Sequence, residues 1–142
     1  MLTRGAPYVP TLDAQAQAAL ELLSLKPGQT LLELGSGDGK VLVAAARAGL
    51  NVVGIELNPF LVVVSWLCTR RYRRQVRIIW GDFWRVDWPP CDGVFTFLLD
   101  RFMPRLDTRM QKVHRPLVSF AFQIPGRQPD AAQAGVYLYR YN

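Results

Sequence analysis

The sequence of 142 residues predicts an α/β domain, a largely parallel β-sheet with helices on both faces. Apolar runs typical of strands alternate along the chain with stretches of helical periodicity, as in repeated strand–helix–strand units. Each predicted strand is a nearly continuous apolar run, which is typical of strands that are buried on both faces. A glycine cluster joins the first strand to the next helix, where sheets of this kind bind ligands.

The first predicted elements are a helix, a strand, a tight turn and a second helix. Thr11 is a favourable N-cap, and apolar residues recur after it at helical spacing until Pro27-Gly28 ends the run. Thr30–Leu34 is a short apolar strand that ends in the cluster Gly35-Ser36-Gly37-Asp38-Gly39. The second helix follows at 41–48.

The remaining elements continue the alternation and give about six strands in all. In order, they are strand 51–57, helix 59–74, strand 76–80, strand 92–99, helix 101–113, strand 117–124 and strand 136–141. The link 81–91 has room for at most one helical turn, near 83–85. The link 125–135 is too short and too polar for a crossover helix, so the last strand should lie antiparallel beside the fifth.

Composition and charge fit a single domain over residues 1–142. Half of the residues are hydrophobic and 20 % are charged, which excludes a disordered or low-complexity chain. The net charge of +6 favours an anionic partner such as nucleic acid, anionic lipid or an acidic ligand. Cys68 and Cys91 lack metal or redox spacing, so we expect two buried thiols and no metal site. Without a signal sequence or a spanning apolar run, we expect a protein that is cytoplasmic or peripheral to a membrane.

The glycine cluster predicts a ligand site at the end of the first strand. A glycine turn lets the backbone approach a ligand and directs helix N–H groups toward an anion. The dinucleotide fingerprint is excluded because Lys40 stands where its last glycine is needed, and no P-loop ending follows.

Three acids, Glu33, Glu56 and Asp82, lie at the ends of three successive strands. Any one of them could be a charged strand end that meets solvent. Together with the loop they favour an adenosine ligand, and Glu56 would accept hydrogen bonds from its ribose hydroxyls.

The segment Leu32–Gly39 resembles the first motif of class I S-adenosylmethionine (SAM)-dependent methyltransferases. The resemblance implies a Rossmann-like class I methyltransferase sheet with strands 3-2-1-4-5 parallel plus a final antiparallel strand, and SAM as cofactor. Glu33 would receive the cofactor's amino group, and Asp82 would accept from the adenine amino group. The implied cofactor-binding residues are Thr11, Glu33, Gly35, Ser36, Gly37, Asp38, Gly39, Glu56, Leu57, Asp82 and Phe83.

The flanking segments resemble a narrower group, the small class I protein lysine methyltransferases. This group includes the mitochondrial enzymes that act on the ATP synthase c subunit and the adenine nucleotide translocase. The segments are Ala6–Thr11, Glu56–Val62, Asp82–Asp87 and Met103–Leu106. This resemblance implies a protein lysine N-methyltransferase whose partner is a protein substrate, soluble or membrane-associated.

The same resemblance implies that residues 1–29 form a segment and helix covering the cofactor site, with Tyr8 to Thr11 closing over it. Thr11 is otherwise a plain helix cap. Leu98-Leu99-Asp100 and the link 125–135 depart from these relatives, so the identity of the substrate is not implied.

The candidate catalytic residues are Asp100 and Tyr8. A lysine nucleophile must lose a proton, and an apolar channel favours its neutral form. Tyr8 and the apolar residues around the end of the fourth strand would line such a channel; the latter are Phe97, Leu98, Leu99 and Phe102. Asp100 either orients the amine or caps the next helix.

The helix after the second strand leaves other functions open. Its apolar run 60–68 precedes arginines 70, 71, 73, 74 and 77. It is either a buried helix with a solvated basic end, or a face for an anionic membrane or a partner helix. The same arginines, with Tyr72 and Trp80, would also suit an RNA or DNA methyltransferase. The third alternative is a SAM-binding protein without catalytic activity.

Overall fold

The computed structural model describes the backbone of residues 5–142 and the side chains of residues 13–142. The helices are α1 (Gly5–Leu23), α2 (Lys40–Arg47), α3 (Pro59–Cys68) and α4 (Met103–Val113), with 3₁₀ turns η1 (Arg70–Tyr72) and η2 (Asp100–Phe102). The strands are β1 (Thr30–Leu34), β2 (Asn51–Glu56), β3 (Val76–Trp80), β4 (Gly93–Thr96), β5 (Leu117–Phe120), β6 (Ala131–Gln133) and β7 (Val136–Tyr139).

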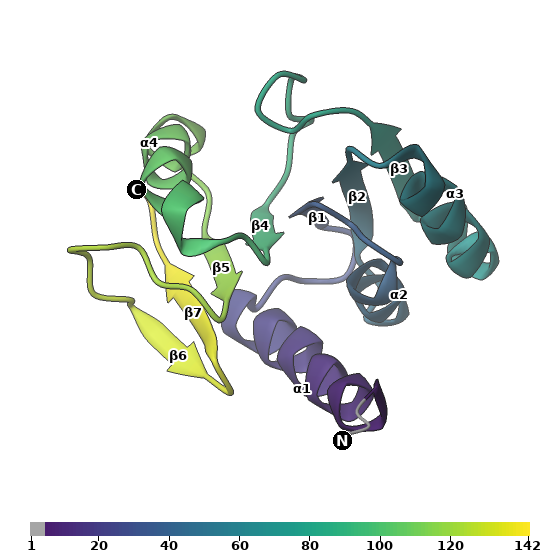
Figure 1. The fold of residues 1–142 in the computed structure, drawn as a ribbon, viewed down its shortest axis with the longest axis horizontal. Helices are drawn as coiled ribbons and strands as arrows, with labels where there is room; N and C mark the ends of the chain where they lie inside the picture. Colours follow the sequence, from purple (N-terminus) through teal and green to yellow (C-terminus); the bar gives the residue numbers. More distant parts are fainter. Residues whose placement is uncertain (1–4) are drawn as a thin grey trace.

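These strands form one twisted sheet in the order β3-β2-β1-β4-β5-β7-β6 (Figure 1). β1 to β5 are parallel, and β7 lies antiparallel to β5. The predicted strand order and the final antiparallel strand are therefore confirmed.

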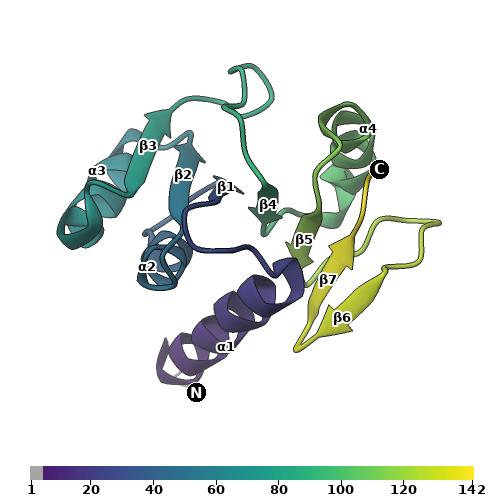
Figure 2. The ribbon, with the colours of Figure 1, turned by 180° about the vertical axis from the view of Figure 1, so that it is seen from behind.

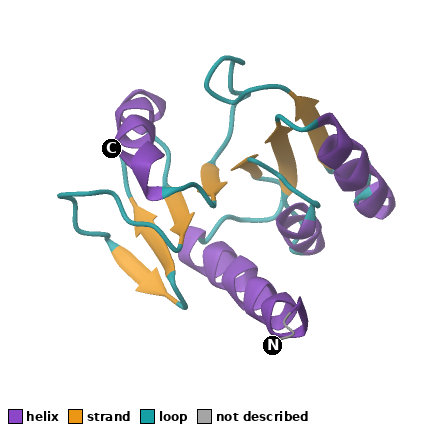
Figure 3. Cartoon of the chain, in the orientation of Figure 1, coloured by secondary structure: helices purple, strands orange, loops and turns teal. Residues whose placement is uncertain are grey.

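Helices cover both faces of the sheet (Figure 3). On one face, α1 and α2 bury residues such as Ala19 and Leu42 together with Phe95 of β4. α3 contacts α2, β2 and β3 at the edge of the molecule that is farthest from β6 (Figure 2). On the other face, α4 buries Met103 and Met110 against the sheet, and the loop that follows β3 packs beside it. Within residues 5–142, no helix combines the length and hydropathy that a bilayer span requires.

The sheet has one strand more than the six we predict from the sequence. β6 forms within the link 125–135 and pairs antiparallel with β7. Ala134 and Gly135 join the two strands, and both have positive φ, 53° and 76°, as a two-residue hairpin turn requires. The polar composition of the link predicts a loop, and β6 is indeed a largely exposed edge strand.

Several predicted boundaries and environments are wrong. α1 begins at Gly5, so Thr11 lies inside the helix rather than at its N-cap. The helix predicted for 59–74 ends at Cys68, and η1 follows it. Cys68 is exposed rather than buried, and Cys91 is half-buried. Burial raises the pKa of the Cys91 thiol to about 11.

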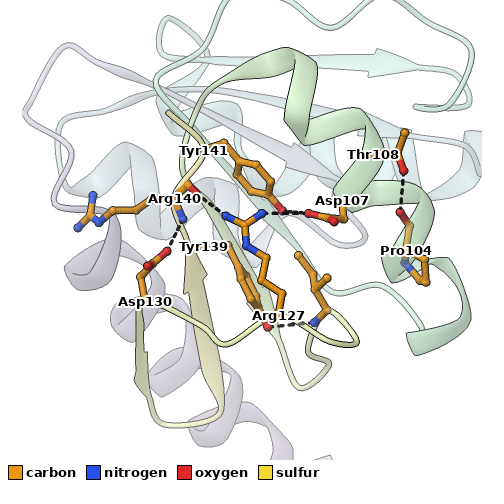
Figure 4. Close-up of polar contacts among 9 residues, drawn as sticks. Pro104, Asp107, Thr108, Arg127, Asp130, Tyr139, Arg140 and Tyr141 are labelled. Atoms are coloured by element: carbon orange, nitrogen blue, oxygen red, sulfur yellow. Dashed lines mark hydrogen bonds and ion pairs between the residues drawn. The ribbon is translucent and has the colours of Figure 1, made fainter.

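A polar cluster fastens the C-terminal strand to α4 (Figure 4). Arg127 donates to Asp107 Oδ1 at 3.1 Å and to the Arg140 carbonyl at 2.6 Å. The Tyr141 hydroxyl donates to the same Asp107 oxygen at 2.7 Å, and the Arg127 guanidinium lies 4.2 Å from the centre of the Tyr141 ring. Burial, and then the bond to Asp107, raise the pKa of Tyr141, so its hydroxyl stays protonated as a donor.

Candidate cofactor and acceptor site

The glycine loop lies where the strand order reverses. β1 has β2 on one side and β4 on the other, so the carboxyl ends of all three strands meet at the loop. The backbone N–H groups of Gly35 and Ser36 donate to the Ile55 carbonyl at 2.8 and 3.3 Å. The loop is therefore fixed to the end of β2.

Two glycines of the loop have different roles. Gly37 has φ +55°, and a Cβ placed on it would meet no atom within 4 Å. Gly39 has φ +88°, and its Cβ would lie 3.3 Å from Ser65 Cα of α3. Gly37 therefore leaves room for a ligand, whereas Gly39 allows α3 to pack closely against the loop.

Ser65 supports the loop, and it is absent from the residues predicted from the sequence. Its hydroxyl donates to the Gly37 carbonyl at 2.6 Å, and it is the one buried residue of α3. Ser36 is buried too, with its Oγ 3.5 Å from Ser65 Oγ. The signal in the sequence was a single hydroxyl within the apolar run from Phe60 to Cys68.

Glu33 at the end of β1 is buried with an unsatisfied carboxylate. Its Oε1 accepts no hydrogen bond from any described residue. Burial, and then the charges of Asp38 and Glu56, raise the pKa of Glu33 well above its usual range. A buried acceptor without a donor, beside two further acids, is a site for a cationic group.

Glu56 joins the loop to the start of α3. Its Oε1 accepts from the Gly37 N–H at 2.8 Å, and its Oε2 accepts from the Asn58 N–H at 3.0 Å. Each oxygen has a second lone pair that a ligand hydroxyl can use. The next residue, Leu57, is 65 % exposed.

The predicted residues at the end of β3 form a turn. Asp82 Oδ1 accepts from the Trp84 N–H at 2.9 Å, and Oδ2 lies 3.8 Å from Arg85 Nε. The Phe83 ring packs against Trp84 with centroids 4.7 Å apart. The backbone turn after Asp82 confirms the single turn predicted near 83–85.

The remaining predicted cofactor residues lie at the rim or outside the described side chains. Asp38 is half-exposed, and its Oδ1 accepts from the Lys40 N–H at 3.2 Å. The side chains of Tyr8 and Thr11 lie outside the described residues.

An aromatic group lies at the same edge of the sheet, after β4 and β5. The Phe97 ring centre is 4.7 Å from that of Phe120 and 6.2 Å from that of Phe122, and Phe97 is 60 % exposed. Phe97 is among the residues predicted from the sequence, whereas the other two are not. Phe120 ends the neighbouring parallel strand β5 and Phe122 follows it, and the end of that strand must meet the same edge.

Asp100 follows this aromatic group at the start of η2. It is exposed, and its carboxylate makes no hydrogen bond or ion pair with the side chains described. The N-caps of η2 and α4 are Leu99 and Phe102, so Asp100 does not cap the next helix. Its carboxylate is therefore available to a ligand.

A sheet of this order, with a glycine loop and buried acids at its switch point, defines the class I SAM-dependent methyltransferases. The chain belongs to the ANTKMT methyltransferase domain family, whose sequence profile matches residues 33–131.

Named relatives agree with this assignment. The enzyme of Xenopus laevis named as the lysine N-methyltransferase of the ATP synthase c subunit is 33 % identical over 131 residues, covering 87 % of this chain and 57 % of that protein. A protein-lysine N-methyltransferase of Saccharolobus islandicus is 29 % identical, with 87 % and 81 % covered. The chain therefore spans less than two thirds of the length of the Xenopus relative.

A solved structure has the same fold. The RNA methyltransferase of Salinibacter ruber, crystallised with S-adenosyl-L-homocysteine, superposes with a TM-score of 0.79 at 28 % identity. The match covers 89 % of this chain and 88 % of that one.

Proposed function

We propose that this chain is a SAM-dependent protein lysine N-methyltransferase. The observation that carries the proposal is the aromatic group around the exposed Phe97, with an Asp100 that has no partner among the described side chains, at the same sheet edge as the acid-lined glycine loop. The family match and the names of the lysine methyltransferases similar to this chain also support it.

The residues around the loop fit SAM. The cofactor carries an ammonium and a sulfonium, and it supplies an activated methyl group when it is bound. Glu33, with its unpartnered buried oxygen, would receive the ammonium, and Asp38 and Glu56 add negative charge nearby. The glycine cradle and the N-terminus of α2 would receive the carboxylate.

The other proposed contacts of the cofactor are those implied by the family. Glu56 would accept from the ribose hydroxyls with its remaining lone pairs. Asp82 would accept from the adenine amino group, with Leu57 and Phe83 beside the ring. Tyr8 and Thr11 would close over the cofactor from α1, as a part of residues 1–29.

The acceptor lysine must lose a proton before it reacts. With a solution pKa of about 10.4, roughly one amine in 2,500 is neutral at pH 7, a cost of about 4.6 kcal/mol. The phenyl rings of Phe97, Phe120 and Phe122 would exclude water and lower the amine pKa. Asp100 would then accept a hydrogen bond from the amine and orient its lone pair.

An Asp100→Asn variant tests the acceptor side of this proposal. We expect turnover to fall at least tenfold while the dissociation constant for SAM is unchanged, because the residue lies outside the glycine loop. Asp87→Asn, which changes another exposed acid, is the matched control and should retain turnover. Full turnover in Asp100→Asn would remove Asp100 from the mechanism.

Methylation of RNA is the second candidate function. The arginines of η1 and the Salinibacter ruber neighbour favour it. Radiolabelled SAM incubated with the protein and a cell extract separates the two: lysine methylation predicts label that protease releases and that is recovered as methyl-lysine. Label lost on nuclease digestion would contradict the lysine proposal, and SAM binding without any label would favour a non-catalytic protein.

A further inference from the structure

We propose that α3 and η1 form a surface that binds an anionic lipid bilayer, with α3 lying in the plane of the membrane. Here the apolar-basic face means the exposed side chains of Phe60, Val63, Trp66, Leu67 and Trp80 together with Arg70, Arg71, Arg73, Arg74 and Arg77. This inference goes beyond the proposed methyl transfer and does not depend on it.

The apolar half of the face is a row along α3 that the fold leaves uncovered. Phe60, Val63 and Leu67 recur at the spacing of one helix face, and Trp66 lies beside them. Phe60 is 72 % exposed and Trp66 60 %. Of the ten residues of α3, Ser65 is fully buried and Leu61, Val62 and Val64 are half-buried, so the rest of the helix surface is open to solvent. Isolated exposed apolar residues are ordinary, but a contiguous row of this size indicates an interaction surface.

The row continues along the outer edge of the molecule. α3 contacts the edge strand β3, and no other helix lies beyond it (Figures 1 and 2). Trp80 at the end of β3 is 65 % exposed, and its indole N–H donates to the Leu57 carbonyl at 3.0 Å. Two tryptophans, Trp66 and Trp80, therefore lie on this edge. Tryptophan favours the boundary between lipid chains and headgroups.

The basic half of the face identifies the occupant. η1 follows α3, and two arginines in it and two just after it border an open hollow of about 350 Å³, lined by Arg70, Arg71, Tyr72, Arg73, Arg74 and Gln75. Among the described residues, none of the five arginines forms an ion pair. No Asp or Glu lies between Glu56 and Asp82, whereas the whole chain has a net charge of only +6. The positive charge of the protein is therefore concentrated beside its largest exposed apolar row.

An anionic bilayer matches both halves at once. Its phosphates would enter the arginine hollow, and its acyl boundary would receive the apolar row, as for amphipathic helices that lie in the interface. A second copy of the chain would place five arginines against five, and an RNA would leave the row of Phe60, Val63 and Leu67 in water. The charge pattern therefore favours lipid over either alternative.

Vesicle flotation tests the proposal with the full chain. We expect the protein to float with phosphatidylcholine vesicles that contain phosphatidylglycerol and not with phosphatidylcholine alone. Arg70→Gln, Arg73→Gln and Arg74→Gln combined should lower the partition coefficient roughly 100-fold, at about fivefold per arginine. The matched control combines Lys26→Gln, Lys112→Gln and Arg140→Gln, which removes the same charge outside the face and should keep most of the binding.

The apolar row has its own readout. Tryptophan emission should shift to shorter wavelength when phosphatidylglycerol vesicles are added, and Trp66→Phe should lose much of this shift. Phe60→Ser with Trp66→Ser should abolish flotation; because both side chains are exposed, a circular dichroism spectrum should confirm that the variant stays folded.

Three results would overturn the proposal. The first is equal flotation of the arginine variant and its charge-matched control. The second is a concentration-dependent dimer that Trp66→Ser disperses, without flotation, which would assign the face to a second copy. The third is salt-sensitive RNA binding that the arginine variant loses, again without flotation.

Discussion

Glu33 shows at the scale of a single residue how a site can oppose the stability of its own fold. The carboxylate is buried, one oxygen has no donor among the described residues, and two more acids lie near enough to raise its pKa. Such a residue destabilises the free protein whenever it is ionised. In the proposed function, the ammonium of the cofactor would supply the missing partner.

The stability of the free protein should therefore depend on Glu33 in a defined direction. Because the pKa is raised in the folded state, the folded protein holds the proton more tightly than the unfolded chain does. Stability should fall as the pH rises from about 4.3, the value in the unfolded chain, through the folded pKa. We expect Glu33→Gln to be more stable than the wild type in urea at pH 7, with the difference shrinking toward pH 4.

The same substitution should have the opposite effect on the ligand. Glu33→Gln should weaken SAM at least tenfold in calorimetry, because a neutral amide replaces the partner of the ammonium. A variant that is less stable at pH 7, or that binds SAM as tightly as the wild type, would contradict this assignment of Glu33.

At the scale of the element, a polar cluster adds a second connection between the C-terminal hairpin and the rest of the fold, beside the pairing of β7 with β5. β7 is a core strand that buries Val136, Leu138 and Tyr139, whereas β6 is short, mostly exposed and paired on one side only. Asp107 on α4 accepts from both Arg127 and Tyr141, and Arg127 also holds the carbonyl of Arg140 (Figure 4). The carboxylate of Asp107 thus connects α4 to the segments before β6 and after β7.

Removing that carboxylate should loosen the connection. We expect Asp107→Ala to lower the free energy of unfolding by about 1–3 kcal/mol, since it leaves a guanidinium and a phenol hydroxyl without their acceptor. Urea denaturation measures the effect, and hydrogen exchange should rise first in β6 and β7. Thr108→Ala, on the next position of the same helix, should change stability by less than about 0.5 kcal/mol. Equal losses in the two variants would show that the cluster has no special role.

At the scale of the whole molecule, the sheet gathers negative charge at one site on a protein that is positive overall. Glu33, Asp38 and Glu56 lie around the loop, whereas the arginines of η1 lie at the far end of α3. A ligand with positive groups and an adenosine is therefore preferred at the loop over a polyanion of similar size.

Ligand stabilisation should follow that preference. At 100 times its dissociation constant, SAM should raise the free energy of unfolding by about 2.7 kcal/mol. For a chain of this length we expect the melting temperature to rise by roughly 8 °C. ATP shares the adenosine but carries negative charge, so it is the matched control and should have little effect. A shift of the same size with ATP would contradict a site built for a cation.

β1 and β2 were predictable because each is buried along nearly its whole length, and β3 because its apolar run is intact although it is a half-exposed edge strand. β4, which also borders the switch point, spans Gly93–Thr96 and is shorter than the strand predicted for 92–99. The apolar runs predict the same first and last residues of β1 and β3 as the structure has. For β2 the predicted end lies one residue beyond the observed end. β6 was missed because it is polar and paired on one side only, so no apolar pattern marks it. The start of α1 was misplaced because Thr11 satisfies the local preference of an N-cap, although the helix begins at Gly5.

The candidate site also has residues that the sequence predicts and residues that only the fold reveals. The acids at the strand ends could be identified from the sequence, since a residue that ends a parallel strand must reach the carboxyl edge of the sheet. Other residues of the site could not: Ser65 under the loop, and Phe120 and Phe122 beside Phe97, come from elements that only the fold brings together. Nor did the sequence exclude a capping role for Asp100, which the N-caps of η2 and α4 rule out.

The sequence by itself determined the fold class, the strand order through a family resemblance, and the acids around the glycine loop. These depend on patterns within short segments, where burial and spacing are read directly from residue type. Only the tertiary structure decided that a carboxylate oxygen of Glu33 lacks a donor within the described part of the chain, and that α3 exposes its apolar row to solvent. The physical reason is that the hydrogen bonding and solvent exposure of a side chain depend on the residues that lie near it in space. For residues far apart in the chain, the packing of the whole sheet decides which of them lie together.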